Sequence, residues 1–309
     1  MGVRLLQTFL DTLRNANIKQ VHLRQLNGKK IAVDISIYLY RFKGTGNLIE
    51  SMYLMCSIFR YYNIHPIFVF DGKPKDFKKE TLEKRYLTRQ KAKDELKNLE
   101  IKMRNSTALQ NKVDKLRKQT ISVCKKDVVD VKDFLDVYGM TYITATNEAD
   151  EVCAALCLKK MVYACLTEDT DLMAYGSPII MRYFSLVKHT CVTYDMSEIL
   201  NDINMTTQEF QELCACSGND YINTERNIFY YYGLFKKYKT SPQIRFIDWL
   251  LNNRYLSCQE YYKRCDIYNI YTMKNTDSLV GMPYTIIKNK KICGRKLIPI
   301  LESAGFVYP

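Results

Sequence analysis

Short apolar runs alternate with longer amphipathic stretches along the first two thirds of the chain. The apolar runs have the length and the content of β-branched and aromatic residues of buried strands, and they lie at residues 30–36, 66–72, 140–145 and 162–166. Helical periodicity separates them, most clearly over residues 47–62 and 147–161. Because short strands that alternate with helices usually form a parallel sheet with crossover helices, the pattern predicts an α/β fold.

The pattern changes after the fourth apolar run. Alternating residues at 177–184 and 188–195 predict a β-hairpin, and helical patterns follow over residues 196–203 and 206–218. Beyond Asp220 the chain is rich in Tyr and Lys and is expected to be mainly helical.

A strongly basic stretch interrupts the strands between residues 73 and 126. It holds 18 Lys or Arg against 7 Asp or Glu, an excess of 11, whereas the net charge of the whole chain is +13. Strong helix formers and the absence of Pro after Pro74 predict two basic helices that stand away from the core, with a turn at Asn105–Thr107. A solvated coiled-coil hairpin is the alternative, but the one-sided charge favours an anionic partner between the helices.

The composition narrows the class of protein. A net charge of +13 suggests nucleic acid or a membrane surface as partner. No apolar run approaches the ~18 residues that a spanning helix needs, and the basic helices lack the apolar face of a membrane-surface helix. The 11 cysteines are scattered through apolar patterns, as expected of reduced core residues in a soluble intracellular protein, and only 3 histidines argue against a zinc site.

Acidic side chains lie at or just after the carboxyl ends of all four predicted strands. These acids are Asp34, Asp71, Glu148, Asp150, Asp169 and Asp171. Because the carboxyl ends of parallel strands share one edge of a sheet, we expect the six carboxylates to converge. Each acid alone could be a turn or helix-cap residue, but together they repel unless protons or cations neutralise them. Oxygen ligands favour Mg²⁺ or Mn²⁺, and two such ions fit phosphodiester hydrolysis.

Longer motifs in the same segments carry a family resemblance. They are MGVRLL, AVDISIYLYRF, HPIFVFDGKP, ATNEADEVCAAL, LTEDTDLMAYGSPIIMR and CSGNDY, in that order. The chain resembles the flap endonuclease–XPG family of structure-specific 5′ nucleases over residues 1 to about 222. The resemblance implies a PIN-like parallel-sheet nuclease core at residues 1–222, with a basic helical arch at about 73–126. Residues 223–309 would then be a divergent helical region.

The resemblance also implies a metal site. The family's seven metal-site acids correspond to Asp34, Asp71, Glu148, Asp150, Asp169, Asp171 and Asp220, which would hold two Mg²⁺ ions, with Mn²⁺ able to substitute. Asp220 is implied by the resemblance alone, since it follows no predicted strand. Glu168 falls between matched positions and is expected to be a bystander.

Further residues match positions that contact nucleic acid in the family. Lys78 and Arg85 would reach the scissile phosphate from the base of the arch, and Gly2 would lie where the chain begins beside the active site. Tyr40 would stack on a base, although an ordinary core tyrosine is equally consistent with the sequence. The second arch helix would carry three lysines that line the path of a 5′ single strand: Lys115, Lys118 and Lys125.

The chain departs from the family pattern in two places. The family usually has Glu at position 150, where this chain has Asp, and activity is expected to survive the shorter side chain. After Asp220 the family's glycine-rich helix–two-turn–helix, which binds duplex phosphates and a monovalent cation, is degenerate here. Lys236, Lys237 and Lys239 could replace its phosphate contacts.

The expected function is therefore a Mg²⁺-dependent 5′ endo- and exonuclease. It would act as a monomer on DNA with 5′ flaps, nicks, gaps or junctions, in replication, repair or recombination. The C-terminal segment LIPILESAGFVYP contains no sliding-clamp motif. The alternatives are a family member that cuts messenger RNA and a catalytically silent protein that binds nucleic acid.

Overall fold

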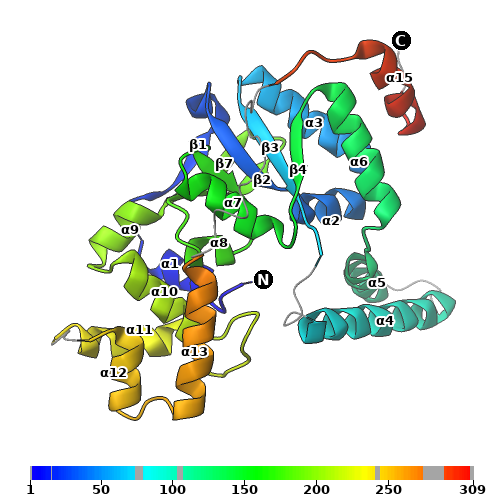
Figure 1. The fold of residues 1–309 in the computed structure, drawn as a ribbon. Helices are drawn as coiled ribbons and strands as arrows, with labels where there is room; N and C mark the ends of the chain where they lie inside the picture. The colour runs from blue at the N-terminus through cyan, green and yellow to red at the C-terminus, as the bar shows by residue number, and fades with distance from the viewer. Residues whose placement is uncertain are drawn as a thin grey trace.

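The computed structural model describes residues 2–14, 16–73, 79–102, 107–240, 244–273 and 289–306. Its first 200 residues are built around one seven-stranded sheet with the order β1-β7-β6-β5-β2-β3-β4 (Figure 1). The strands are β1 (Ile18–His22), β2 (Lys30–Asp34), β3 (His65–Phe70), β4 (Thr141–Thr144), β5 (Ala164–Leu166), β6 (Ile179–Ser185) and β7 (Thr190–Asp195).

Five neighbouring strands of this sheet are parallel, from β4 through β3, β2 and β5 to β6. The predicted parallel sheet is therefore confirmed, and so is the hairpin, because β6 pairs with β7 antiparallel. The edge strand β1, which pairs antiparallel with β7, was not predicted. Only Val21 in β1 is buried, so this strand has little apolar pattern to reveal it.

The helices cover both faces of the sheet, and their apolar sides form two clusters. In β2, Ile31 and Val33 belong to one cluster and Ala32 to the other, as expected for side chains that alternate across a strand. Both faces are thus buried, which explains why the strands read as continuous apolar runs. On the face of Ile31 lie α2 (Ser36–Gly44), α3 (Leu48–Tyr61), α6 (Lys125–Tyr138) and α15 (Gly294–Ser303).

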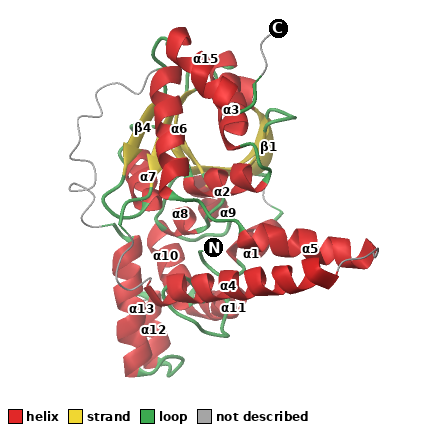
Figure 2. Cartoon of the chain, turned by 90° about the vertical axis from the view of Figure 1, so that its right-hand side faces the viewer, coloured by secondary structure: helices red, strands yellow, loops and turns green. Residues whose placement is uncertain are grey.

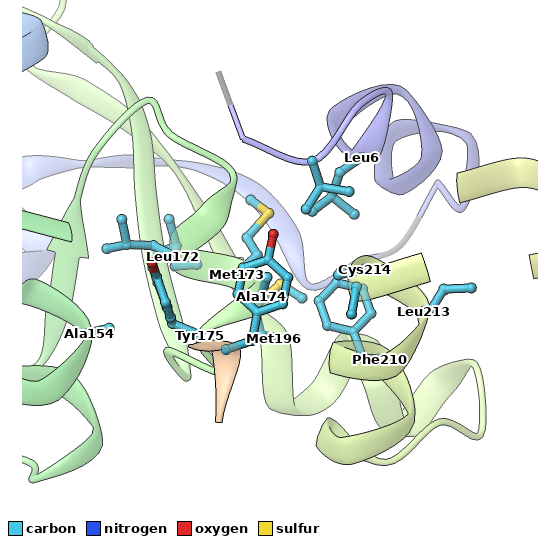
Figure 3. Packing of buried hydrophobic residues seen from close by; sticks show 14 of the residues in the cluster. Leu6, Ala154, Leu172, Met173, Ala174, Tyr175, Met196, Phe210, Leu213 and Cys214 are labelled. Atoms are coloured by element: carbon cyan, nitrogen blue, oxygen red, sulfur yellow. The ribbon is translucent and has the colours of Figure 1, made fainter. Parts of the chain in front are cut away.

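The other face is covered by more helices, including the C-terminal ones. They are α1 (Leu6–Thr12), α7 (Ala149–Leu158), α8 (Asp171–Ala174), α9 (Met196–Asp202), α10 (Thr207–Cys216), α11 (Ile228–Tyr238), α12 (Phe246–Asn252) and α13 (Cys258–Tyr271). Figure 3 shows how Phe210 and Leu213 of α10 gather with Leu6 and Met173 in one buried cluster. The C-terminal helices share this cluster with the sheet, and the predicted boundary near residue 222 stays a prediction.

The basic stretch forms a helical hairpin that stands away from the sheet (Figures 1 and 2). Helix α4 (Lys79–Lys102) packs against α5 (Thr107–Thr120), with Val113 and Leu116 buried between them. Lys112 of α5 also pairs with Glu95 of α4 at 2.6 Å. The two predicted basic helices are confirmed, while most of the predicted turn at Asn105–Thr107 lies outside the described residues.

The last described segment returns to the sheet rather than staying with the C-terminal helices. The backbone N–H of Lys290 donates to the carbonyl of Gly139 at 2.8 Å. The guanidinium of Arg60 donates to the carbonyl of Lys290 at 2.6 Å and also to that of Tyr138. These bonds fix the segment that precedes α15 against the ends of α3 and α6.

The cysteines agree with the sequence analysis. All eleven are free thiols, and seven of them are buried. Within the described ranges, no helix combines the length and apolar character needed to cross a membrane.

Candidate active site at the carboxyl ends of the strands

The carboxylates that end β2 and β3 lie side by side. Asp34 is the last residue of β2, and Asp71 directly follows β3. Ser36 joins them, because its backbone N–H donates to Oδ1 of Asp34 at 3.2 Å and its hydroxyl donates to Oδ2 of Asp71. The first turn of α2 therefore holds two strand ends together.

The end of β5 joins the same group. The hydroxyl of Thr167 donates to Oδ2 of Asp34 at 2.9 Å and accepts from the backbone N–H of Asp169 at 3.0 Å. Oδ1 of Asp169 in turn accepts from the N–H of Asp171 at 3.1 Å. Thr167 therefore connects the acidic segment after β5 to the end of β2.

The acids at the start of α7 are fixed through Asp71. Oδ1 of Asp71 accepts from the backbone N–H of Ala149 at 2.9 Å, which holds the N-terminus of α7 against the end of β3. Glu148 is the N-cap residue of this helix, and Asp150 lies in its first turn and is 8% exposed. The structure thus brings the acids of four strand ends to one edge of the sheet, whereas their role as metal ligands stays a prediction.

The electrostatics of this edge favour a bound cation. Burial, reinforced by the charges of Asp71 and Asp169, raises the pKa of Asp34 from 3.8 to about 7, against the opposing hydrogen bonds from Thr167 and Ser36. A carboxyl group with a pKa of about 7 is protonated in about half of the molecules at neutral pH, and a nearby positive charge would favour its ionised form. The edge therefore carries more negative charge than the fold accommodates by itself.

The donor chemistry fits hard divalent ions such as Mg²⁺ or Mn²⁺, since every candidate ligand is a carboxylate. Within the ranges that the structure describes, no three His, Cys, Asp or Glu side chains lie close enough together to hold one ion. Carboxylates repel one another when no cation lies between them, so ligands that share an ion must turn toward it on binding. The number of ions and their ligands stay predictions.

A tyrosine from the C-terminal helices reaches this site. Asp171 is fully buried, and the hydroxyl of Tyr271, at the end of α13, donates to its Oδ1 at 3.3 Å. Burial raises the pKa of Tyr271 well above its ordinary value, so the hydroxyl keeps its proton and remains a donor. No sequence pattern pointed to Tyr271, because the contact joins residues 100 positions apart and belongs to no motif.

The start of the chain lies against the acidic segment. Gly2 has φ +89°, and a Cβ at this position would lie 2.5 Å from Oδ1 of Asp169 and 2.8 Å from the backbone N of Asp171. Only glycine fits this approach without strain. Gly2 and Arg4 also line a cavity of about 190 Å³ together with Asp220, the seventh predicted acid. Asp220 therefore lies near the start of the chain, which itself contacts the acidic segment after β5.

The predicted nucleic-acid contacts on the arch are only partly described. Lys78 lies outside the described residues, and Arg85 lies on α4 with its side chain outside them. Tyr40 is 41% exposed, and the Arg89 guanidinium lies 5.9 Å from the centre of its ring. The alternative that Tyr40 is a core residue is therefore wrong.

The lysines of the second arch helix need one correction. Lys115 and Lys118 are exposed on α5, as predicted. Lys125 is not on that helix, because α5 ends at Thr120 and Lys125 is the first residue of α6. A capping box between Cys124 and Asp127 starts the new helix.

The side chain of Glu168 contacts residues of β6, which agrees with its expected role as a bystander to the metal site. Its Oε1 accepts from the backbone N–H of Tyr183 at 2.7 Å, and its Oε2 lies 3.7 Å from Nε of Arg182. The side chain thus holds the irregular part of β6 rather than pointing at the other acids.

Comparison with known proteins places this geometry in a family. Two family models match the chain, the XPG N-terminal domain over residues 1–92 and the XPG I-region over residues 139–220. The chain belongs to the XPG family of structure-specific nucleases. All seven predicted acids of this XPG-family chain fall inside the two matched segments, and most of the helical hairpin lies between them.

Individual relatives agree with this membership. Flap endonuclease 1 of Glycine max is 32% identical over 247 residues, which are 74% of this chain and 63% of the relative. The chain thus spans less than two thirds of that relative's length. The catalytic core of Rad2 in complex with a DNA substrate has the same fold, with a TM-score of 0.69 at 21% identity, over 99% of this chain and 95% of that one. The structure of GEN1 in complex with product DNA and a Mg²⁺ ion is also similar. Its TM-score is 0.60 at 17% identity, over 93% of this chain and 70% of the GEN1 chain.

Proposed function

We propose that this XPG-family chain is a divalent-metal-dependent nuclease that hydrolyses phosphodiester bonds in DNA at 5′ flaps, nicks, gaps or junctions. Replication, repair and recombination are the processes that generate such DNA. One observation carries the proposal: acids from four strand ends are hydrogen-bonded into one edge of the sheet, in a chain whose positive charge is concentrated on one helical hairpin.

The relatives support this choice of substrate. The relative from Glycine max is a flap endonuclease, and the similar Rad2 and GEN1 structures contain DNA. The GEN1 structure also contains Mg²⁺, which agrees with the oxygen-only donors of this chain.

The seven acids would hold the metal ions, with Asp34, Asp71, Glu148 and Asp150 on one side and Asp169, Asp171 and Asp220 on the other. Bound divalent ions would supply an activated water and compensate the charge that develops at the phosphate. Ser36 and Thr167 orient two of these ligands through the hydrogen bonds described above. In other metal sites, removing a group that hydrogen-bonds to a ligand typically weakens metal affinity about 10–100-fold.

The basic and aromatic residues would hold the substrate. Lys78 and Arg85 would place positive charge where the transition state gains negative charge. Tyr40, whose ring is exposed beside Arg89, would stack on a base near the cut. Lys115 and Lys118 would guide the single strand along α5, a contribution that is electrostatic and weakens with salt.

A cleavage assay tests the proposal. The substrates are a 5′-labelled flap, a nicked duplex, a four-way junction and single-stranded RNA, each with Mg²⁺ or with EDTA. Wild type is compared with Asp169→Asn and with the matched variant Glu168→Gln, which neutralises the neighbouring acid. Mg²⁺-dependent cutting of DNA that is lost only in Asp169→Asn supports the proposal.

The other outcomes have defined meanings. Cutting of RNA alone would assign the chain to RNA decay. Binding of DNA without any cutting would make it a silent binder, and equal loss in Glu168→Gln and Asp169→Asn would contradict the separation of ligand from bystander.

A further inference from the structure

Arg182 of β6 is a buried basic side chain whose hydrogen bonds reach the acidic segment after β5. It is only 6% exposed. Its Nη2 donates to the main-chain carbonyl of Glu168 at 2.7 Å, and its Nη1 donates to Oε1 of Gln7 in α1. Burying a guanidinium costs free energy unless it is paired and hydrogen-bonded, so these partners largely determine where it points.

The carbonyl that Arg182 binds belongs to the peptide unit that leads into Asp169. At the other edge of the same unit, the N–H of Asp169 donates to the hydroxyl of Thr167 at 3.0 Å. Because a peptide unit is planar, hydrogen bonds on its two edges fix its orientation. The direction in which the Asp169 side chain leaves the backbone is therefore set by Thr167 and Arg182 together.

By its charge alone, Arg182 would oppose a cation at this edge of the sheet. A positive charge near carboxylates repels an ion that the carboxylates bind. The side chain of Glu168 offsets part of that charge, since its Oε2 lies 3.7 Å from Nε of Arg182. Any favourable effect of Arg182 on cation binding must therefore come from the orientation that its hydrogen bonds impose.

The backbone of β6 is irregular at the point where it meets Glu168. The register between β6 and β7 shifts between Arg182 and Ser185, and Tyr183 has φ +55°. The N–H of Tyr183 donates to Oε1 of Glu168 at 2.7 Å. Irregularities of this kind often redirect a side chain beside a functional site. Here two neighbouring groups of β6, the Arg182 guanidinium and the Tyr183 N–H, bind one residue of the acidic segment.

Gln7 connects this arrangement to α1. Its Nε2 donates to the hydroxyl of Tyr194 and to Oδ1 of Asp11, both at 2.7 Å. An amide whose nitrogen is held by two acceptors keeps its oxygen turned toward the guanidinium. The same part of the chain places Gly2 against Oδ1 of Asp169. The start of the chain therefore reaches the acidic segment at two points.

We propose that Arg182 and Gln7 are positioning residues for the predicted metal ligand Asp169, and that they act through the main-chain carbonyl of Glu168. Neither side chain contacts the ion or the substrate in this role. They hold the peptide unit before Asp169 in the orientation from which its carboxylate meets the ion. This inference rests on the proposed function, because it assumes that Asp169 binds a divalent ion.

The experiment measures ion binding to the whole chain without nucleic acid. Electron paramagnetic resonance of free Mn²⁺ gives the Kd, and thermal denaturation gives the Tm of each variant. The variants are Arg182→Gln, Arg182→Lys and Gln7→Met, and Asp169→Asn shows which part of the binding belongs to the predicted site. The control is Arg60→Ala, which removes another guanidinium that donates to main-chain carbonyls, at the ends of α3 and α6.

Arg182→Gln is expected to raise the Kd for Mn²⁺ about tenfold, although the loss of a positive charge by itself would lower it. Arg182→Lys keeps the charge but not the planar fork, so it should also raise the Kd several-fold. Gln7→Met should do the same, and adding it to Arg182→Lys should add little, because both residues act through one carbonyl. Arg60→Ala should lower the Tm and leave the Kd unchanged.

Four results would overturn the proposal. They are unchanged or tighter Mn²⁺ binding in Arg182→Gln, wild-type affinity in Arg182→Lys, an equal rise of the Kd in Arg60→Ala, and Mn²⁺ binding that Asp169→Asn does not weaken. If Arg182→Gln does not fold, Arg182→Lys and Gln7→Met decide the question.

Cleavage of the flap substrate by wild type separates this inference from the proposed function. If wild type binds Mn²⁺ but cuts no nucleic acid, the proposed function fails, while the Mn²⁺ comparison still decides the role of Arg182. If wild type cuts DNA and the variants bind Mn²⁺ as wild type does, the inference alone fails.

Discussion

The contact between Gly2 and the acidic segment leads to a specific prediction. An alanine at position 2 would place its Cβ 2.5 Å from Oδ1 of Asp169 and 2.8 Å from the backbone N of Asp171. Ordinary non-bonded contacts lie at about 3.5–4.0 Å, so the acidic segment must shift by about 1 Å. The alanine must also adopt φ +89°, which costs about 1–2 kcal/mol.

Gly28→Ala is the matched control. Gly28 also has a positive φ, +73°, but no atom lies within 4 Å of its missing Cβ. The control therefore carries the backbone strain without the collision. Both variants should lose at least about 1–2 kcal/mol of stability in thermal denaturation, because both place alanine in the left-handed region, and Gly2→Ala should lose more because of its collision.

Only Gly2→Ala should lose activity. A displacement of about 1 Å in a reacting group can slow catalysis about 100-fold, which corresponds to about 2.7 kcal/mol of activation free energy. Single-turnover cleavage of a 5′-flap substrate at saturating Mg²⁺ measures this loss. A Gly2→Ala rate equal to that of wild type, or an equal slowing in Gly28→Ala, would refute the reasoning.

Three further predictions concern side chains that do not lie at the carboxyl ends of the strands, namely Tyr271, Arg60 and Asp248. Tyr271→Phe removes the hydroxyl that donates to Asp171, so the Mg²⁺ concentration for half-maximal cleavage should rise about tenfold; an unchanged titration would argue that the contact does not position the ligand. Arg60→Ala removes the guanidinium by which α3 holds the end of α6 and the segment before α15, and urea denaturation should show a loss of about 2 kcal/mol, with wild-type stability as the contrary result. The pKa of Asp248 is lowered from 3.8, chiefly by its hydrogen bond from Arg245, so the pair's stability is present above pH 3.8 and is lost as the pH falls through the lower pKa of the folded state. Asp248→Asn should therefore lose up to about 1 kcal/mol at neutral pH and less in acid, and an equal loss at both pH values would contradict the sign.

The sequence was most informative where a signal is local. The apolar runs at residues 30–36 and 66–72 carry Asp34 and Asp71 near their carboxyl ends, and the parallel arrangement of the strands β2 and β3 then places these two acids together. The same reasoning found the acids after β4 and β5, because the carboxyl ends of all parallel strands share one edge. Asp220 needed the family resemblance, since it follows a helix rather than a strand.

Features that depend on tertiary contacts were not predictable in this way. Tyr271 reaches Asp171 across 100 residues, and no periodicity records such a contact. The placement of Lys125 was wrong because the break after α5 depends on Cys124, and cysteine is not among the residues favoured as helix caps. The edge strand β1 was missed because one buried side chain does not make an alternating pattern.

The central claim is that the acids at the sheet edge bind divalent ions, and anomalous diffraction from crystals grown with Mn²⁺ tests it most directly. We predict two manganese peaks among the acids, one beside Asp71 and Asp150 and one beside Asp169 and Asp171. In Asp169→Asn only the peak beside Asp169 and Asp171 should be lost. Absence of manganese from this edge in a well-ordered crystal, or manganese bound only elsewhere on the chain, would contradict the claim.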